Sequence, residues 1–398
     1  MLINRILKDV LASVFDYLPV VTLTGPRQSG KTTLCRKLFG ELPYVNLEDE
    51  SILSEIEYDP KRFLSKYPDG VIIDEAQRFA KIFSYLQVAV DNDRMTDSTK
   101  RRYIVTGSSN FALMQNASQS MAGRTAVLTL LPLSVEEILS QYPNTETSLL
   151  ILNGGYPAVW TSGIEARQLL ISNYYTTYIE RDLRQLINIK DLHLFNTFVR
   201  LCAGRIGTEF NASSLASDIG VSATTVRSWI SILETSYIVH FVQPYYANIN
   251  KRLTKSPKLF FHDTGLATWL LGIYTKEQLD VHPLRGSLFE NMVVNEIIKQ
   301  KLNRGQNPQL FFYRDQQQHE VDILEEMPDG SLRAYEVKSA MTYRQDFFTQ
   351  LSYIRKTLGN KIISTRVIYD GDQENNQDFD GIINFRSLSK HSHNQRFI

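Results

Sequence analysis

The first 130 residues alternate between short apolar runs and segments with a helical pattern. Most of the apolar runs are nearly continuous, and they cover residues 20–24, 44–47, 71–73, 103–106 and 126–130. Continuous apolar runs of this length are typical of parallel strands that are buried on both faces. Residues 3–17 and the segments between the runs have helical patterns. The alternation predicts βαβ units and a sheet with helices on both faces, which is an α/β fold.

The pattern changes along the rest of the chain. Residues 151–190 favour helices and predict a helical connector. Residues 191–262 favour helices that are followed by a basic, strand-like end. Residues 263–398 begin with a helical segment and continue with several strands, which indicates a second α/β unit. With residues 1–150 as the first unit, the pattern predicts four domains.

Composition narrows the class of protein. The chain has 398 residues, of which 43% are hydrophobic and 22% charged, as expected for a folded protein with several domains. Lys plus Arg equals Asp plus Glu at 43 each, so binding to nucleic acid would depend on a local patch. The two cysteines lie far apart, which fits a reducing compartment. No run reaches the ~18 apolar residues of a membrane helix, and the N-terminus lacks the apolar core of a signal peptide. We therefore expect a cytoplasmic protein without a membrane partner.

A glycine-rich sequence follows the first predicted strand and precedes a helix. It matches G-x-x-x-x-G-K-S/T, the pattern of a phosphate-binding loop. Its two glycines let backbone amides surround the phosphates, and the helix N-terminus adds positive charge. Its lysine reaches the β- and γ-phosphates, and the next hydroxyl is a ligand for Mg²⁺. The sequence predicts ATP and Mg²⁺ as ligands of Gly25, Pro26, Arg27, Gln28, Ser29, Gly30, Lys31, Thr32 and Thr33.

Two carboxylates end the third apolar run, at Asp74 and Glu75. Polar groups at the end of a buried parallel strand lie beside the phosphate loop. Asp74 is therefore predicted to hold Mg²⁺, and Glu75 to act as the base that polarises the attacking water. The alternative is an acidic turn at the end of a strand.

Further candidates for catalysis lie downstream. Ser108 and Asn110 follow the next strand and could sense the γ-phosphate, although the segment is also rich in turn-forming residues. Arg124 could stabilise transferred charge, in cis or from a neighbouring subunit. An ordinary surface ion pair is the alternative for Arg124.

Several motifs together resemble a known family. They are Gly25-Pro26-Arg27-Gln28, Asp74-Glu75-Ala76-Gln77, Leu131-Pro132-Leu133-Ser134, Gly154-Gly155-Tyr156-Pro157, Tyr178-Ile179-Glu180-Arg181-Asp182, Asp263-Thr264-Gly265-Leu266 and Leu288-Phe289-Glu290-Asn291. The chain resembles, over nearly its whole length, bacterial and archaeal AAA-type ATPases with a C-terminal domain of unknown function. The resemblance implies a core in which another strand separates the strands of the phosphate loop and of Asp74. It implies no cellular role.

Residues 211–235 have the pattern of a helix-turn-helix. Ser222 can cap the second helix, and Val226, Trp229, Ile230 and Leu233 form its apolar stripe. The outer face of this helix carries polar side chains that suit contacts in the major groove of DNA. They are Thr224, Thr225, Arg227, Ser228 and Ser231. A basic run follows and predicts the phosphate-binding wing of a winged helix, with Lys251, Arg252, Lys255 and Lys258. The alternatives are a spacer or protein-binding module and a solvated lysine run.

The C-terminal unit contains acidic residues in a hairpin pattern. Two alternating runs flank the turn Pro328-Asp329-Gly330, and period two places Glu320 and Asp322 on one face. The order of these residues, Glu and Asp followed by Glu-x-Lys, is similar to the motif of the PD-(D/E)xK restriction-endonuclease-like fold. That resemblance implies that Asp322 and Glu336 hold Mg²⁺, Glu290 supports it, and Lys338 activates water. The alternatives are an ordinary hairpin with a surface Glu–Lys pair and a nuclease-like fold kept for binding.

Two functional hypotheses follow. The first is an ATP-driven protein that acts on double-stranded DNA through the winged helix and the nuclease-like domain. The second is a nucleotide-dependent switch that binds a protein partner and has no nuclease activity. Either hypothesis is compatible with a homo-oligomer.

Overall fold

The computed structural model describes residues 3–96, 101–108, 121–183, 191–246, 256–376 and 380–392. Within these residues, the first sheet has five strands in the order β2-β3-β4-β1-β5, and all neighbours are parallel. This arrangement confirms the predicted α/β core, with β4 between the strands of the phosphate loop and of Asp74. The strands are β1 (Val20–Thr24), β2 (Tyr44–Asn46), β3 (Gly70–Asp74), β4 (Arg102–Thr106) and β5 (Thr125–Thr129).

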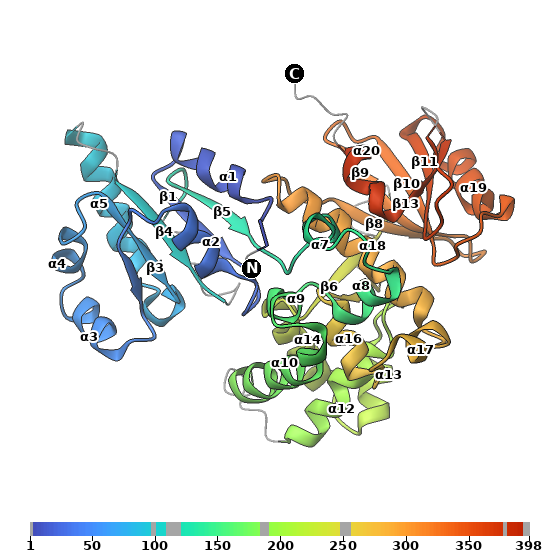
Figure 1. The fold of residues 1–398 in the computed structure, drawn as a ribbon, viewed down its shortest axis with the longest axis horizontal. Coiled ribbons are helices and arrows are strands. Elements are labelled where there is room, and N and C mark those ends of the chain that lie inside the picture. The colour runs from blue at the N-terminus through green and yellow to red at the C-terminus, as the bar shows by residue number, and fades with distance from the viewer. Residues whose placement is uncertain are drawn as a thin grey trace.

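Alternate residues of these strands face two hydrophobic cores. Val20, Val71 and Ile73 belong to the core under α3, α4 and α5, whereas Val21 and Ile72 belong to the core under α1 and α2. Helices therefore cover both faces of the sheet, as Figure 1 shows. The helices are α1 (Lys8–Ser13), α2 (Lys31–Leu38), α3 (Glu50–Tyr58), α4 (Pro60–Ser65) and α5 (Ile82–Thr96).

The first helix is shorter than the 3–17 pattern predicted. It begins at Lys8, and a 3₁₀ turn at Val14–Asp16 follows it. Residues before the helix are held by the buried Arg5 side chain, which bonds to three distant groups. These tertiary contacts outweigh the local helical preference.

Helices fill the middle of the chain. Tyr174, Tyr178 and Ile179 are buried in the large central core. The elements are α7 (Val135–Gln141), α8 (Thr147–Asn153), α9 (Pro157–Thr161), α10 (Arg167–Tyr174), a π-helix (Tyr175–Leu183) and α12 (Leu192–Ala203).

A helix-turn-helix and a hairpin come next. Asn211 caps α13 (Ala212–Ile219), which ends at Gly220 with a left-handed φ of 80°. Ser222 caps α14 (Ala223–Thr235). The antiparallel hairpin then consists of β6 (Val239–Pro244) and β7 (Lys258–Phe261).

The hairpin belongs to the C-terminal sheet. Within the described residues this sheet has eight strands in the order β12-β13-β11-β10-β9-β8-β6-β7, and β6 pairs in parallel with β8. The remaining elements are α16 (Thr264–Leu270), α17 (Lys276–Asp280), α18 (Arg285–Leu302), β8 (Leu310–Arg314), β9 (Glu320–Glu326), β10 (Leu332–Lys338), α19 (Thr349–Leu358), β11 (Ile362–Tyr369), β12 (Asn375–Asn376), β13 (Asp380–Asn384) and α20 (Leu388–Ser392).

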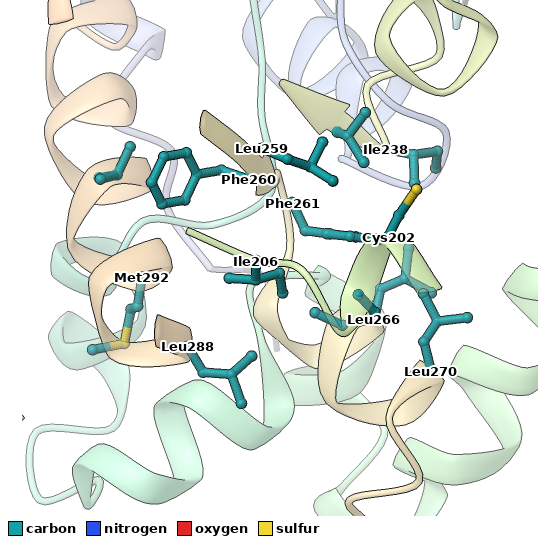
Figure 2. Close-up of a cluster of buried hydrophobic side chains, with 14 of the residues drawn as sticks. Cys202, Ile206, Ile238, Leu259, Phe260, Phe261, Leu266, Leu270, Leu288 and Met292 are labelled. Atoms are coloured by element: carbon teal, nitrogen blue, oxygen red, sulfur yellow. The ribbon is translucent and has the colours of Figure 1, made fainter. Parts of the chain in front are cut away.

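One hydrophobic core crosses the predicted boundary at residue 262. Figure 2 shows Cys202 and Ile206 near Phe261 of β7, together with Leu266 of α16 and Leu288 of α18. The predicted units 191–262 and 263–398 therefore share a core. Among the described residues, no helix is both long and apolar enough to cross a membrane.

Candidate functional site

The loop between β1 and α2 requires two glycines. Gly25 has a φ of 141°, and a Cβ there would lie 2.2 Å from the carbonyl oxygen of Leu130. Gly30 has a φ of 94°, a conformation that side chains disfavour. The glycines therefore let the chain turn sharply between the strand and the helix.

Lys31 lies buried beneath this loop. Its ammonium donates hydrogen bonds to the carbonyl oxygens of Gly25, at 2.9 Å, and Pro26, at 2.8 Å. Burial lowers the pKa of Lys31 to about 8, although the charges of Glu75 and Asp74 act in the opposite direction. Both hydrogen-bond partners are neutral, so a phosphate anion would balance the ammonium charge.

Asp74 receives hydrogen bonds from three hydroxyl groups. Thr32 donates to Oδ2 over 2.7 Å, and Tyr44 donates to the same oxygen over 2.8 Å. Thr106 donates to Oδ1. The contact between Thr32 and Asp74 joins the two predicted Mg²⁺-binding residues, and such oxygen donors suit Mg²⁺.

Sequence reasoning missed Tyr44 and Thr106. They lie on β2 and β4, which flank β3 on its two sides. The signal that could have identified them was polar residues within apolar runs that neighbour the Asp74 strand.

Glu75 begins the turn after β3 with a left-handed φ of 54°. Its Oε2 accepts a hydrogen bond from Ser108 Oγ over 3.2 Å and another from the Gln77 amide. The structure thus brings together Glu75 and one of the two residues predicted to sense phosphate. Asn110 lies outside the described residues.

A cavity of about 730 Å³ adjoins the loop, which is the size of a small-molecule site. Residues from several parts of the chain line it. Besides the loop, α2 and Glu75, they include Ile3, Asn4, Arg5, Leu133, Pro157, Ala158 and Thr161. Sequence reasoning assigned no role to these additional residues, although Pro157 falls in a family motif.

Arg5 connects the loop to α7. Its guanidinium donates to the carbonyl oxygens of Ser29 and Leu131, at 2.6 Å each, and to Glu137 Oε1 at 3.1 Å. Glu137 also completes the capping box of α7 with Ser134. The buried Arg5–Glu137 pair therefore fixes the loop relative to the helix after β5.

The prediction that Arg124 acts in cis is wrong. Arg124 directly precedes β5, whereas the phosphate loop follows β1, and the two strands are parallel. The side chain therefore lies at the opposite end of the sheet from the loop. It forms an ion pair with Asp91 over 2.7 and 2.9 Å, in agreement with the alternative interpretation.

The helix-turn-helix residues that are predicted to contact DNA differ in their exposure. Thr224, Arg227, Ser228 and Ser231 are exposed on α14, and Thr225 is half-buried. Lys251, Arg252 and Lys255 lie outside the described residues.

The prediction that Lys258 contacts DNA is wrong. It is buried in β7, where its ammonium pairs with Glu320 over 2.6 Å and Glu290 over 3.2 Å. Pairing of the hairpin with β8 encloses this lysine, so it is not on a surface that a duplex could reach.

The predicted nuclease residues converge together with two lysines. Asp322 accepts a hydrogen bond from the Val337 amide over 2.7 Å, and Glu336 accepts one from Lys338 over 2.6 Å. Burial and the charge of Asp322 raise the pKa of both Glu290 and Glu336. Lys258 and Lys338 supply the cations near these carboxylates.

The predicted metal site finds no support in this arrangement. Among the described residues, no group of three or more His, Cys, Asp or Glu side chains is placed to hold a metal ion. Sequence reasoning missed the contribution of Lys258, which comes from a different predicted domain.

The fold and the loop define an AAA-type P-loop ATPase core. Residues 18–139 match the family described as AAA domain, and residues 144–277 and 285–389 match two domains of unknown function, DUF8612 and DUF4143. The chain is 34% identical over 327 residues to the uncharacterized proteins Rv2008c of Mycobacterium tuberculosis and Mb2031c of Mycobacterium bovis. The alignment covers 81% of this chain and 71% of each relative. The chain belongs to their family.

One solved structure is weakly similar to the chain. The Walker-type ATPase PABY2304 of Pyrococcus abyssi is 14% identical, with a TM-score of 0.43, and the match covers 67% of this chain and 94% of that one.

Proposed function

We propose that the protein binds ATP with Mg²⁺ in the cavity beside the phosphate loop and hydrolyses it to ADP and phosphate. The observation that carries this proposal is the 2.7 Å contact between Thr32 and Asp74, next to the buried ammonium of Lys31. A hydroxyl, a carboxylate and an ammonium at the start of a helix are the groups that MgATP requires.

Each residue has a defined task in this reaction. Lys31 and the loop amides hold the β- and γ-phosphates, and Thr32 and Asp74 would hold Mg²⁺. When bound, the ion neutralises charge on the phosphate oxygens. Glu75 accepts a proton from the water whose oxygen bonds to the γ-phosphorus, while the bond from that phosphorus to ADP breaks.

Two variants test the proposal. Lys31→Ala is expected to abolish binding of a fluorescent ATP analogue, because the phosphates lose their main countercharge. Glu75→Gln is expected to bind the analogue normally and to hydrolyse ATP ~10² times more slowly. Equal loss of binding in both variants would mean that Glu75 has a structural role.

DNA binding is a second candidate function. The observation that favours it is the exposed outer face of α14, with one arginine and several hydroxyl groups. We propose that the helix-turn-helix and β6–β7 act as a winged helix and that the basic residues Lys251, Arg252 and Lys255 contact phosphate.

Salt dependence tests the DNA proposal. Replacing those three residues with Ala is expected to reduce the slope of log affinity against log salt by about 0.9 for each lost phosphate contact. Arg227→Ala is expected to change sequence preference instead. If the wild type shows no salt-sensitive affinity for duplex DNA, the module binds protein and the switch hypothesis gains support.

A nuclease-like fold remains a proposal for the C-terminal sheet. Because Lys258 and Lys338 already form ion pairs with carboxylates of this cluster, we favour a role in binding over cleavage. Incubation of supercoiled plasmid with Mn²⁺ tests this preference. Nicking by the wild type that Asp322→Ala abolishes would establish cleavage instead.

A further inference from the structure

Within the described residues, the Asp74 carboxylate accepts four hydrogen bonds, two on each oxygen. Oδ1 accepts from the Thr106 hydroxyl and, over 3.1 Å, from the amide of Glu75. Oδ2 accepts from the Thr32 hydroxyl over 2.7 Å and from the Tyr44 hydroxyl over 2.8 Å. The orientation of this carboxylate therefore depends on side chains from β2, β4 and α2.

The two donors to Oδ2 differ in their relation to the nucleotide cavity. Thr32 lines the cavity and is a proposed ligand of Mg²⁺, whereas Tyr44 is not among the lining residues. Because Thr32 and Asp74 would hold the same ion, Oδ2, the oxygen that contacts Thr32, is expected to face it. Tyr44 thus donates to this oxygen without being a ligand itself, so its hydrogen bond is compatible with a bound ion.

The ring of Tyr44 is held independently of its hydroxyl. Tyr44 pairs with Ile72 on β3, and Ile72 and Asp74, two residues apart, point to the same face of the sheet. On this face the ring packs against the core under α1 and α2. The Arg36 guanidinium of α2 lies over it, 4.9 Å from the ring centroid. Removal of the hydroxyl alone is therefore expected to leave the ring in place.

We propose that Tyr44 is a positioning residue for Mg²⁺, because its hydroxyl holds Asp74 Oδ2 in the orientation that brings this oxygen to Thr32. Tyr44 acts through Asp74 and does not touch the nucleotide. Removal of a group that orients a metal ligand typically lowers metal affinity by about 10- to 100-fold. This role rests on the proposed binding of ATP with Mg²⁺.

The experiment compares Tyr44→Phe with Tyr103→Phe. Tyr103 is buried on β4, pairs with Val71 near the start of β3, and packs into the core on the opposite face of the sheet. The affinity of a fluorescent, non-hydrolysable ATP analogue is measured in EDTA and in saturating Mn²⁺. Tyr44→Phe is expected to reduce the gain in affinity that Mn²⁺ produces by about 10-fold, whereas affinity in EDTA stays within about twofold. Tyr103→Phe is expected to match the wild type in both measurements.

A double variant distinguishes positioning of Asp74 from a general structural effect. If Tyr44 acts through Asp74, Tyr44→Phe is expected to cause little further loss of the Mn²⁺ gain when Asp74→Asn is already present. Independent losses from the two substitutions would contradict this route. Equal losses of affinity in EDTA and in Mn²⁺ for Tyr44→Phe alone would show that the hydroxyl has only a structural role.

The outcomes separate the two proposals. An unchanged or larger Mn²⁺ gain in Tyr44→Phe, with the gain lost in Asp74→Asn, would overturn the role of Tyr44 and leave the proposed Mg²⁺ site intact. A wild-type protein whose affinity for the analogue does not depend on Mn²⁺ would overturn the proposed Mg²⁺ site and, with it, the role of Tyr44.

Discussion

The Tyr237 hydroxyl donates a hydrogen bond of 2.9 Å to the Thr24 hydroxyl. Thr24 ends the strand that leads into the phosphate loop, and Tyr237 lies between α14 and β6 with a left-handed φ of 57°. The residue after the helix-turn-helix is therefore in direct contact with the strand before the loop. We expect that a nucleotide that moves the loop also affects α14 through this hydrogen bond.

Tyr237→Phe tests this expectation. The substitution keeps the ring and removes one buried hydrogen bond, which is expected to cost about 1 kcal/mol of unfolding free energy. ATP-analogue binding is expected to increase protection of α14 amides from hydrogen exchange in the wild type and to do so less in the variant.

Tyr142→Phe provides the control. Tyr142 also donates a hydrogen bond of 2.9 Å, to the Trp160 carbonyl, away from Thr24. Tyr142 is 36% exposed, so the control is expected to lose less stability than Tyr237→Phe and to keep the full response of α14 to nucleotide. Equal responses in both variants would contradict a route through Tyr237.

Arg5→Met tests the connection between the loop and α7. The substitution leaves the buried Glu137 carboxylate without its guanidinium partner, which is expected to cost about 3–5 kcal/mol of unfolding free energy. The loop also loses its contact at the Ser29 carbonyl, so affinity for ATP is expected to fall. Urea unfolding and binding of an ATP analogue measure the two effects.

A double variant provides the control for Arg5. Arg5→Met with Glu137→Gln removes the unpaired charge and keeps an acceptor for the capping box of α7, so it is expected to recover part of the lost stability without recovering ATP affinity. Recovery of both would show that the effect on ATP is only a result of instability.

The elements that depend on local pattern could be predicted from sequence. The strands of the first sheet, the loop glycines and the caps Asn211 and Ser222 each follow from a short stretch of chain. The contact between Thr32 and Asp74 was also predictable, because the ends of parallel strands meet at one edge of a sheet.

The position of Arg124 is predictable from the same rule. It precedes its strand, so a parallel sheet places it at the far edge from the loop. The order of Arg124 and β5 along the sequence already indicates this position.

Long-range pairing could not be predicted. The burial of Lys258 follows from the contact of β6 with β8, and no local pattern near Lys258 indicates that contact. The role of Arg5 likewise depends on groups at Ser29, Leu131 and Glu137.

Lys258→Met tests the corrected position of this lysine. It leaves Glu290 and Glu320 without their shared cation, and the variant is expected to lose about 3–5 kcal/mol of unfolding free energy. The salt dependence of any DNA binding is expected to stay unchanged, since Lys258 is buried. Lys276, a half-buried lysine whose ion-pair partner is Glu146 rather than Glu290 or Glu320, provides the control through Lys276→Met. A variant of Lys258 with wild-type stability and a reduced salt slope would restore the DNA-contact interpretation.

A pair of histidines, the half-buried His240 and the buried His262, allows a prediction of how stability depends on pH. His240 and His262 pack with ring centroids 4.6 Å apart, and His240 Nε2 lies 2.9 Å from Asn295 Oδ1. The Asn295 nitrogen donates to the Phe261 carbonyl, so its oxygen faces His240 and must accept from a neutral Nε2–H. Burial lowers the pKa of His240 to about 4, and burial together with the neighbouring imidazole lowers the pKa of His262 well below its ordinary value.

Because the folded pKa of His240 is depressed from 6.5 to about 4, the unfolded chain binds more protons between these values. The contribution of His240 to stability is therefore complete above pH 6.5 and is lost as pH falls towards 4, at up to about 1.4 kcal/mol for each pH unit. The buried carboxyl groups of Asp263 and Glu296 have raised pKa values and act in the opposite direction, so the comparison must be between variants.

Urea unfolding from pH 4.5 to 7.5 is expected to give a flatter stability profile for His240→Gln than for the wild type. His193→Gln, at an exposed position of α12, is expected to run parallel to the wild type. Parallel profiles for the wild type and His240→Gln would show that His240 carries a proton in the folded protein.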